Sequence, residues 1–165
     1  MFTPSLLHSA EKLLALCTQK DITIVTAESC TGGLLAGLLT SIAGSSAVFD
    51  CGFVTYSNDS KTELLGVPPE LIAAHGAVSE EVAADMAAGA LEKSNADVAI
   101  SITGIAGPGG GTDDKPVGLV YIGLEDDTYS HTEKHIFSGD RESVRTQAIA
   151  RALHLLHEFV SDGHY

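Results

Sequence analysis

The residue type best suited to covalent chemistry stands in the segment Thr-Ala-Glu-Ser-Cys-Thr-Gly-Gly at positions 26–33, with Ser29 at its centre. The segment joins a β-branched run to a helix rich in leucine and alanine, a junction where ligands collect in open α/β sheets. Backbone amides at the helix start could bind a phosphate or stabilise an oxyanion beside Ser29 acting as a nucleophile. Two alternatives stay open. Either Ser29 or Thr31 is only the helix cap, or Cys30 is the nucleophile, although a cysteine beside a buried strand is more often a packing residue.

A second group, Tyr56 to Lys61, supplies a candidate base. Where no histidine is near, a lysine can activate a serine hydroxyl if its pKa falls from about 10.4 toward 7. Burial or a neighbouring positive charge must supply that shift, which corresponds to about 4 to 5 kcal/mol. Tyr56 could relay the proton or orient the lysine. In the alternative reading, Lys61 is an ordinary solvated lysine at a helix start.

The third candidate is a glycine-rich loop from Thr103 to Gly118. Its many glycines predict unusual backbone angles and amide donors free to face a ligand. Lys115, near its end, could pair with a phosphate, but the loop lacks the Gly-Lys-Ser/Thr of the common phosphate loop and could be a flexible surface segment. Arg141 and Arg145, one helical turn apart, could also meet a phosphate, within one chain or across a subunit boundary, or lie on a solvated face.

The elements that must position these residues follow from the spacing of apolar and β-branched side chains. Strands separated by helices imply parallel crossovers. We therefore expect one α/β domain over residues 1–165, with its core at about 6–159: a mixed, mostly parallel sheet flanked by helices, with a C-terminal antiparallel hairpin and a final helix. Expected helices span 5–20, 34–42, 61–65, a short stretch after 67–70, 80–93 and 141–159. Expected strands span 22–27, 48–56, 97–102, 117–124 and 128–137, with Gly52 as a candidate bulge.

Composition narrows the classes of function. The formal net charge of −13 argues against a groove for nucleic acid and against an anionic membrane surface, but not against one small anionic substrate. Three cysteines without metal-type spacing predict reduced thiols in a cytoplasmic protein. No apolar run is long enough to span a bilayer, and the first residues do not resemble a signal peptide. The pair His154 and His157 is weak support for a metal, so no metal site is expected.

Five segments occur together in an order that resembles the nicotinamide-nucleotide amidase family, also known as the C-terminal domain of the competence- and damage-inducible protein. They are Ala-Glu-Ser-Cys-Thr-Gly-Gly at 27–33, Gly-Phe-Val-Thr-Tyr-Ser-Asn at 52–58, His-Gly-Ala-Val-Ser at 75–79, Gly-Ile-Ala-Gly-Pro at 104–108 and Lys-Pro-Val-Gly at 115–118. The resemblance extends from about Leu6 to Phe159. The chain resembles the stand-alone form of the family, without the N-terminal pyrophosphatase domain that some relatives carry.

The resemblance implies hydrolysis of nicotinamide mononucleotide to nicotinate mononucleotide and ammonia, with no cofactor. It implies Ser29 as nucleophile, Lys61 as its base and Tyr56 as a supporting catalytic residue. We also expect a cytoplasmic homo-oligomer, with a dimer as the first candidate. The residues implied to hold the oxyanion or the substrate are Cys30, Thr31, Gly32, Gly33, Asn58, Thr103, Gly104, Ile105, Ala106, Gly107 and Arg141.

Two other functions compete with this hypothesis. The glycine-rich loops could bind a nucleotide phosphate without any chemistry, as in a regulatory module. Alternatively, the chain could be an amidase for a different carboxamide. Binding without ammonia release would favour the first, and a substrate panel with and without phosphate would test the second.

Overall fold

The computed structural model, which describes residues 2–163, is built on one five-stranded sheet. Its strand order is β2-β1-β3-β4-β5, with β1 parallel to β2 and β3, and with β4 antiparallel to β3 and β5. Four of the five strands therefore run in one direction, which confirms the mixed, mostly parallel sheet and its late hairpin. The strands are β1 Ile24–Glu28, β2 Phe49–Val54, β3 Val98–Gly104, β4 Leu119–Glu125 and β5 Ser130–Ile136.

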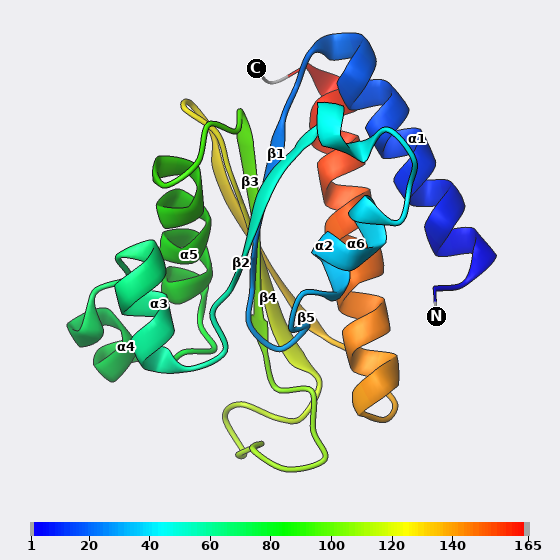
Figure 1. Ribbon diagram of the computed structural model, residues 1–165. Helices are drawn as coiled ribbons and strands as arrows, with labels where there is room; N and C mark the ends of the chain where they lie inside the picture. The colour runs from blue at the N-terminus through cyan, green and yellow to red at the C-terminus, as the bar shows by residue number, and fades with distance from the viewer. Residues whose placement is uncertain (1, 164–165) are drawn as a thin grey trace.

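Helices cover both faces of this sheet (Figure 1). On one face lie α1 Pro4–Lys20, α2 Leu34–Thr40 and α6 Arg141–Asp162, and on the other lie α3 Asn58–Leu65, α4 Pro69–His75 and α5 Glu80–Glu92. A short 3-10 turn, Ser45–Ala47, links α2 to β2. Alternating side chains of the central strands serve the two layers, because Ile100 packs with the first group of helices and Ala99 with the second.

Two local predictions need correction. The ladder between β1 and β2 shifts register at Asp50, between Phe49 and Cys51, so the prediction of a bulge at Gly52 is wrong. Gly52 instead leaves room for α2, since a Cβ there would lie 3.2 Å from the Ala36 Cβ. Helix α3 begins at Asn58 rather than at Lys61, because the Ser57 side chain caps it by accepting a hydrogen bond from the Ser60 amide.

The topology gathers the candidate site at one edge of the sheet. The parallel strands β1, β2 and β3 end at the same edge, so Ser29, Thr55 and Gly104 lie near one another. Strand β5 also ends there, and it delivers the start of α6 to the same place. No helix within residues 2–163 is both long and apolar enough to cross a bilayer.

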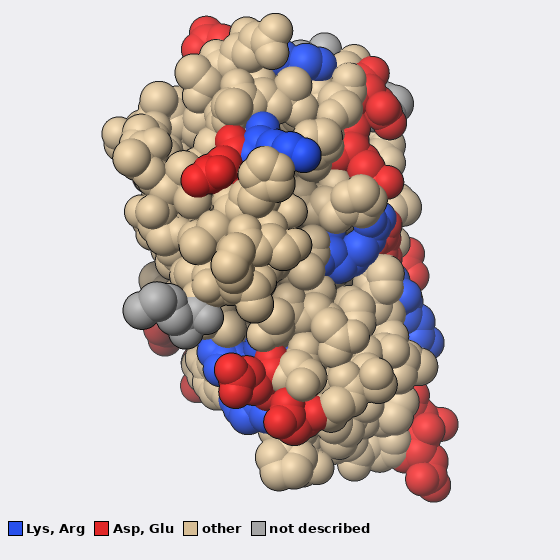
Figure 2. All heavy atoms as spheres, turned by 90° about the vertical axis from the view of Figure 1, so that its right-hand side faces the viewer, with Lys and Arg blue, Asp and Glu red and all other residues tan. Residues whose placement is uncertain are grey.

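Charged side chains are interspersed on the face that Figure 2 presents, the side carrying α1. Lysine and arginine atoms form small separate patches there, most of them next to aspartate or glutamate. This face offers no continuous basic strip of the kind that follows a nucleic-acid backbone.

Candidate active site

Ser29 and Lys61, predicted as nucleophile and base, meet in the structure. The Lys61 Nζ lies 3.0 Å from the Ser29 Oγ. Ser29 directly follows β1, where its amide donates to the Ile102 carbonyl of β3 and fixes the backbone beneath the hydroxyl. Lys61 lies in the first half of α3, which follows the neighbouring strand β2. Both side chains are withdrawn from solvent, with Ser29 8% and Lys61 1% exposed.

The surroundings of the Lys61 amine favour its neutral form. Besides Ser29, the Nζ lies 2.8 Å from the Thr55 carbonyl oxygen and 3.5 Å from that of Ser57. A neutral amine has two N–H donors for these two carbonyls and one lone pair left to accept the Ser29 proton. Burial lowers the pKa of Lys61 from 10.5 to about 8, because the charged form loses its hydration. This lysine is not the solvated residue of the alternative reading.

The helix that follows the nucleophile is capped by a residue that the sequence analysis missed. The buried Glu28 carboxylate accepts hydrogen bonds from the amides of Gly33, Leu35 and Ala36, at 3.1, 3.1 and 2.8 Å. Neither Ser29 nor Thr31 caps α2, so that structural alternative is wrong: the N-cap position is Gly33, which has no side chain. The missing polar residue at Gly33 was the available signal that another group must serve the helix start.

The four amides from Cys30 to Gly33, predicted to face an oxyanion, divide into two pairs. The Gly32 amide donates to the Ser29 carbonyl oxygen and the Gly33 amide donates to Glu28, so these two are engaged. Within residues 2–163, the amides of Cys30 and Thr31 donate to no other residue. Burial raises the pKa of the Cys30 thiol to about 11, which disfavours the thiolate that this residue would need as the nucleophile.

The two arginines of α6 have different hydrogen-bond partners. Arg145 contacts the turn of residues 29–33, the nucleophile turn, through two consecutive carbonyl oxygens. Its Nε donates to the Cys30 carbonyl at 3.1 Å and its Nη2 donates to the Thr31 carbonyl at 2.9 Å. Arg141 donates from Nη1 to the Gly107 carbonyl and from Nη2 to the Tyr56 hydroxyl, at 2.9 and 2.8 Å. Arg141 thus bridges the glycine loop and the tyrosine.

A cavity of about 220 Å³ opens at the Ser29 hydroxyl. Seven of the residues predicted for the site besides the two reacting ones lie in its wall, and the glycine-rich segment contributes only part of its length. Predicted residues outside the wall are Thr31, Gly32, Gly33, Ile105 and Gly107. The lining residues are Ser29, Cys30, Tyr56, Asn58, Lys61, Ala77, Val78, Thr103, Gly104, Ala106 and Arg141.

Tyr56 lies at the rim of this cavity rather than in its depth. Its side chain is 61% exposed, and its hydroxyl has Arg141 as its hydrogen-bond partner. Neither Lys61 nor Ser29 forms a hydrogen bond with the tyrosine hydroxyl among the described residues. The geometry therefore favours a role in shaping the cavity mouth over a proton relay.

The glycine loop is anchored at its far end by Lys115. Its Nζ donates to the carbonyl oxygens of His75 and of Val78, the latter at 2.8 Å. Thr103, at the near end, donates from its hydroxyl to the Ala77 carbonyl at 2.8 Å. These contacts tie the loop to the end of α4 and to the segment between α4 and α5, so Lys115 acts as a structural clamp.

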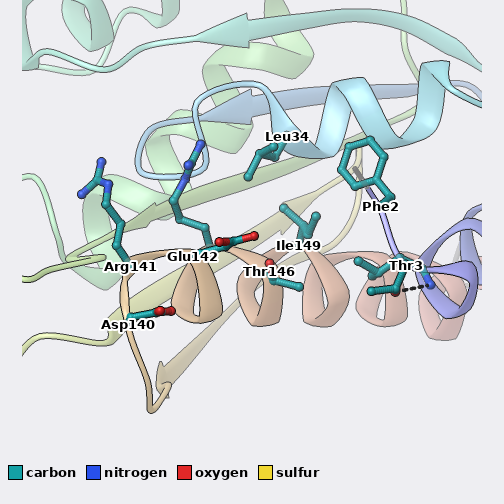
Figure 3. Close-up of a pocket in the computed structure, with 10 residues that line it drawn as sticks. Phe2, Thr3, Leu34, Asp140, Arg141, Glu142, Thr146 and Ile149 are labelled. Atoms are coloured by element: carbon teal, nitrogen blue, oxygen red, sulfur yellow. Dashed lines mark hydrogen bonds between the residues drawn. The ribbon is translucent and has the colours of Figure 1, made fainter.

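A larger hollow of about 570 Å³ lies beside the first turns of α6 (Figure 3). Its wall contains Phe2, Leu34 and Ile149 together with Arg141 and Arg145, and it contains neither Ser29 nor Lys61. Because it lacks a nucleophile, the smaller cavity is the better candidate for the chemistry.

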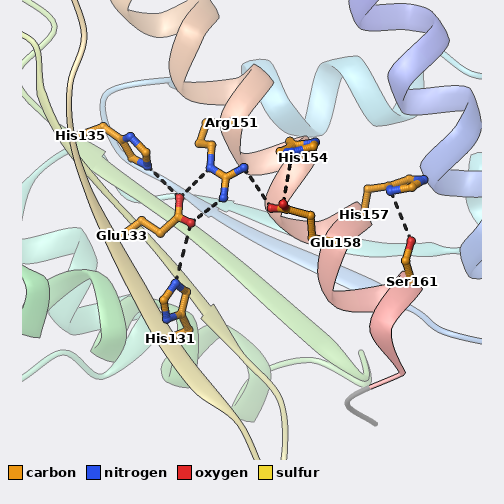
Figure 4. Close-up of polar contacts among 8 residues, drawn as sticks. All are labelled: His131, Glu133, His135, Arg151, His154, His157, Glu158 and Ser161. Carbon is orange, nitrogen blue, oxygen red and sulfur yellow. Dashed lines mark hydrogen bonds and ion pairs between the residues drawn. The ribbon is translucent and has the colours of Figure 1, made fainter.

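Histidines gather instead on β5 and α6 (Figure 4). His131 and His135 contact Glu133, which also receives two hydrogen bonds from Arg151. Residues 2–163 contain no group of three or more His, Cys, Asp or Glu side chains arranged to hold a metal ion.

Comparison with known proteins assigns the chain to a family. Residues 7–160 match the CinA C-terminal domain. The chain belongs to the CinA C-terminal domain family. Among solved structures, this CinA domain is similar to the competence/damage inducible protein CihA from Agrobacterium tumefaciens, with a TM-score of 0.92 and 44% identity over 94% of this chain and 96% of that chain.

Curated relatives of two different lengths are similar to this CinA domain. Nicotinamide-nucleotide amidohydrolase PncC of Escherichia coli K12 is 48% identical over 94% of this chain and 95% of that protein. A CinA-like protein of Mycolicibacterium gilvum is 58% identical over 86% of this chain, but only 34% of that protein is matched. The CinA domain described here spans about a third of the length of such relatives, between 34% and 37%.

Proposed function

We propose that this CinA domain hydrolyses the carboxamide of nicotinamide mononucleotide to a carboxylate and ammonia, by a serine-lysine mechanism. The observation that carries the proposal is the buried 3.0 Å contact between Lys61 Nζ and Ser29 Oγ at the floor of a cavity. The similarity over almost its whole length to the E. coli protein named nicotinamide-nucleotide amidohydrolase supports the choice of substrate.

Acylation begins when neutral Lys61 takes the proton from Ser29. The Ser29 Oγ attacks the carboxamide carbon and forms a C–O bond, and the carbonyl oxygen becomes an oxyanion. The free amide of Cys30, the residue that follows the nucleophile, is the first donor we assign to this oxyanion. The C–N bond then breaks as Lys61, now charged, returns the proton to the departing nitrogen, and ammonia leaves.

Deacylation repeats these steps with water. Lys61 is neutral again and takes a proton from a water that attacks the acyl carbon. Collapse of the second tetrahedral intermediate releases the nicotinate product and returns the proton to the Ser29 oxygen. Every proton transfer in this scheme is made by a residue of the cavity.

The dimensions of the cavity suggest how the substrate lies. Its volume of about 220 Å³ is below the 300 to 1,000 Å³ of pockets that enclose a whole ligand, so only the nicotinamide end would be enclosed. The ribose phosphate would then extend past the rim, where Arg141 offers a guanidinium held by Tyr56 and Gly107. Asn58, Thr103, Gly104 and Ala106 would line the ring pocket.

Ammonia release from nicotinamide mononucleotide by wild type and Ser29→Ala tests the proposal. We expect turnover by the wild type and none by the variant, with the same circular dichroism spectrum for both. Full activity in the variant would remove Ser29 from the mechanism. A Cys30→Ala variant is the matched control, because it removes the rival nucleophile from the same turn and should keep its activity.

Two measurements separate this proposal from its competitors. Calorimetric binding of nicotinamide mononucleotide without ammonia release would favour a nucleotide-binding module. Equal turnover of nicotinamide riboside, which lacks the phosphate, would favour an amidase of broader specificity. A homo-oligomer and a cytoplasmic location stay predictions, and sedimentation of the purified chain would test the first.

A further inference from the structure

The Arg145 side chain binds backbone atoms of the nucleophile turn and not its side chains. Its Nε and Nη2 donate to the carbonyl oxygens of Cys30 and Thr31, at 3.1 and 2.9 Å. The arginine lies 115 positions beyond Cys30 in the chain, in the first half of α6. It is also absent from the wall of the cavity that contains Ser29 and Lys61. Its two hydrogen bonds therefore act on the turn from outside the substrate cavity.

Because these two hydrogen bonds fix the direction of two carbonyl groups, they also fix the direction of the N–H groups on the opposite side of the turn. The peptides of this turn are trans, so each carbonyl points away from the N–H of the same peptide unit. With the Cys30 carbonyl held by Arg145, the Thr31 N–H points away from the guanidinium. The next N–H, that of Gly32, points back at the Ser29 carbonyl and donates to it at 3.1 Å. Successive N–H groups in such a turn, here with Gly32 at φ +60°, form a concavity that suits an anion.

The backbone of Cys30 is thus fixed on both sides. The Ser29 carbonyl before it accepts the Gly32 amide, and its own carbonyl accepts Arg145. The Cys30 amide lies between these two fixed points and is free of other partners among the described residues. A donor that stabilises an oxyanion must be held in place before the charge develops.

We propose that Arg145 is a positioning residue of the amidase, which holds the Cys30 amide in place for the oxyanion by binding the carbonyl oxygens of Cys30 and Thr31 on the other side of the turn. The inference rests on the proposed function and extends it to a residue that does not touch the substrate. It separates the two arginines of α6: Arg141 binds the substrate at the cavity rim, and Arg145 sets the shape of the nucleophile turn.

Arg145→Gln and Arg145→Lys, assayed for ammonia release, test the proposal. We expect Arg145→Gln to lower kcat about 100-fold, the effect of a displacement of about 1 Å in a reacting geometry, while KM changes less than about 3-fold. Arg145→Lys, which can reach one carbonyl but not both in a fixed fork, should recover part of the loss. Guanidinium ion added to Arg145→Ala should raise kcat, because it can occupy the emptied position.

Arg151→Gln is the matched control. Arg151 also lies on α6 and also ties it to another element, through two hydrogen bonds to Glu133 on β5 (Figure 4). Its loss should leave kcat within about 2-fold of wild type, since its partners are remote from the turn. An equal loss of kcat in Arg151→Gln would show that the effect comes from general loosening of α6 and would overturn the proposal.

Three further outcomes are decisive. A raised KM with unchanged kcat in Arg145→Gln, present for nicotinamide mononucleotide and absent for nicotinamide riboside, would make Arg145 a phosphate ligand and refute the positioning role. An unimpaired Arg145→Gln beside an active wild type would refute this inference alone. A wild type that releases no ammonia would refute the amidase and this inference with it. If Arg145→Gln fails to fold, Arg145→Lys and the guanidinium experiment give the answer.

Discussion

Lys61 Nζ lies 2.8 Å from the carbonyl oxygen of Thr55, the first residue after β2, so the base is anchored to the strand next to that of the nucleophile. The contact has a consequence for proton transfer. A carbonyl oxygen accepts but never donates, so it orients the amine without competing for the lone pair that Ser29 needs. Hydrogen bonds to backbone carbonyl oxygens therefore orient the amine of Lys61 toward Ser29.

The dependence of activity on pH should report Lys61. Because catalysis requires the neutral amine, kcat/KM should rise with pH through an apparent pKa of about 8. Rates of ammonia release between pH 6 and about 9.5 would measure it. A profile that is flat across this range, or that falls as pH rises, would contradict the assignment of Lys61 as the base.

Replacing Lys61 should change stability in a pH-dependent way. The pKa is 10.5 in the unfolded chain and about 8 in the folded one, so the unfolded state binds more protons between these values and wild-type stability rises with pH there. Below pH 8 the folded protein carries the charged lysine, and its free energy of unfolding is reduced by the whole cost of burying that charge. Lys61→Met should therefore be more stable than wild type at pH 7, by at most about 3 kcal/mol, and the advantage should shrink by pH 10. Urea unfolding at both pH values measures it, and an advantage that grows with pH would contradict it.

Arg141→Ala should weaken binding of the phosphorylated substrate. The loss of one charge-assisted contact predicts a KM for nicotinamide mononucleotide about 10- to 100-fold higher. The KM for nicotinamide riboside should hardly change. Equal effects on the two substrates would place the phosphate elsewhere.

Glu28→Ala should destabilise the turn that carries the nucleophile. It leaves the amides of Gly33, Leu35 and Ala36 without an acceptor, and the free energy of unfolding should fall by about 3 kcal/mol. Glu28→Gln, which keeps one carbonyl acceptor, should lose less. Urea unfolding compares them, with the exposed Glu63→Ala as control; equal stabilities for Glu28→Ala and this control would contradict the capping role.

Glu133 should contribute to stability against acid. The hydrogen bonds from Arg151, aided by His135, lower its pKa from 4.5 to about 2. This contribution is complete above pH 4.5 and is lost as the pH falls through the folded-state value. Thermal unfolding at pH 7 and pH 3 should show a smaller loss of Tm for Glu133→Gln than for wild type, and parallel losses would contradict it.

Local sequence patterns predicted most of the fold. The β-branched run identifies β1, and the spacing of apolar residues identifies α1 and α6. A helix buried on one side repeats its apolar residues every three to four positions, whereas a strand buried on both faces is a short continuous apolar run. The start of α3 was misplaced because Ser57, and not the residues after it, provides the cap. The bulge was placed at the wrong residue because an extra residue in a strand has no fixed sequence signature. A glycine within a strand suggests a bulge, but here the extra residue is Asp50.

The candidate site was predictable where residue type determines the chemistry. A serine at a strand-to-helix junction and a lysine near a helix start indicated a nucleophile and a base. Glu28 and Arg145 were not predictable in the same way, because their partners are backbone groups. Glu28 serves a helix that begins six positions later, and Arg145 reaches the turn only once α6 has packed on the sheet. The sequence shows at most that the start of α2 lacks a capping side chain at Gly33, and not which residue serves it.

The extra residue at Asp50 has a consequence at the opposite end of its strand. A ladder that continued evenly from Ile24 opposite Phe49 would bring Glu28 opposite Phe53, and not opposite Val54 as observed. Deleting one residue there would draw the chain leading to Lys61 back by about 3.3 Å and turn alternate side chains to the other face of the sheet. The position of Lys61 relative to Ser29 thus depends on the register at a point four residue pairs away, and the loss of a single residue from β2 should abolish the proposed activity without altering any residue of the cavity.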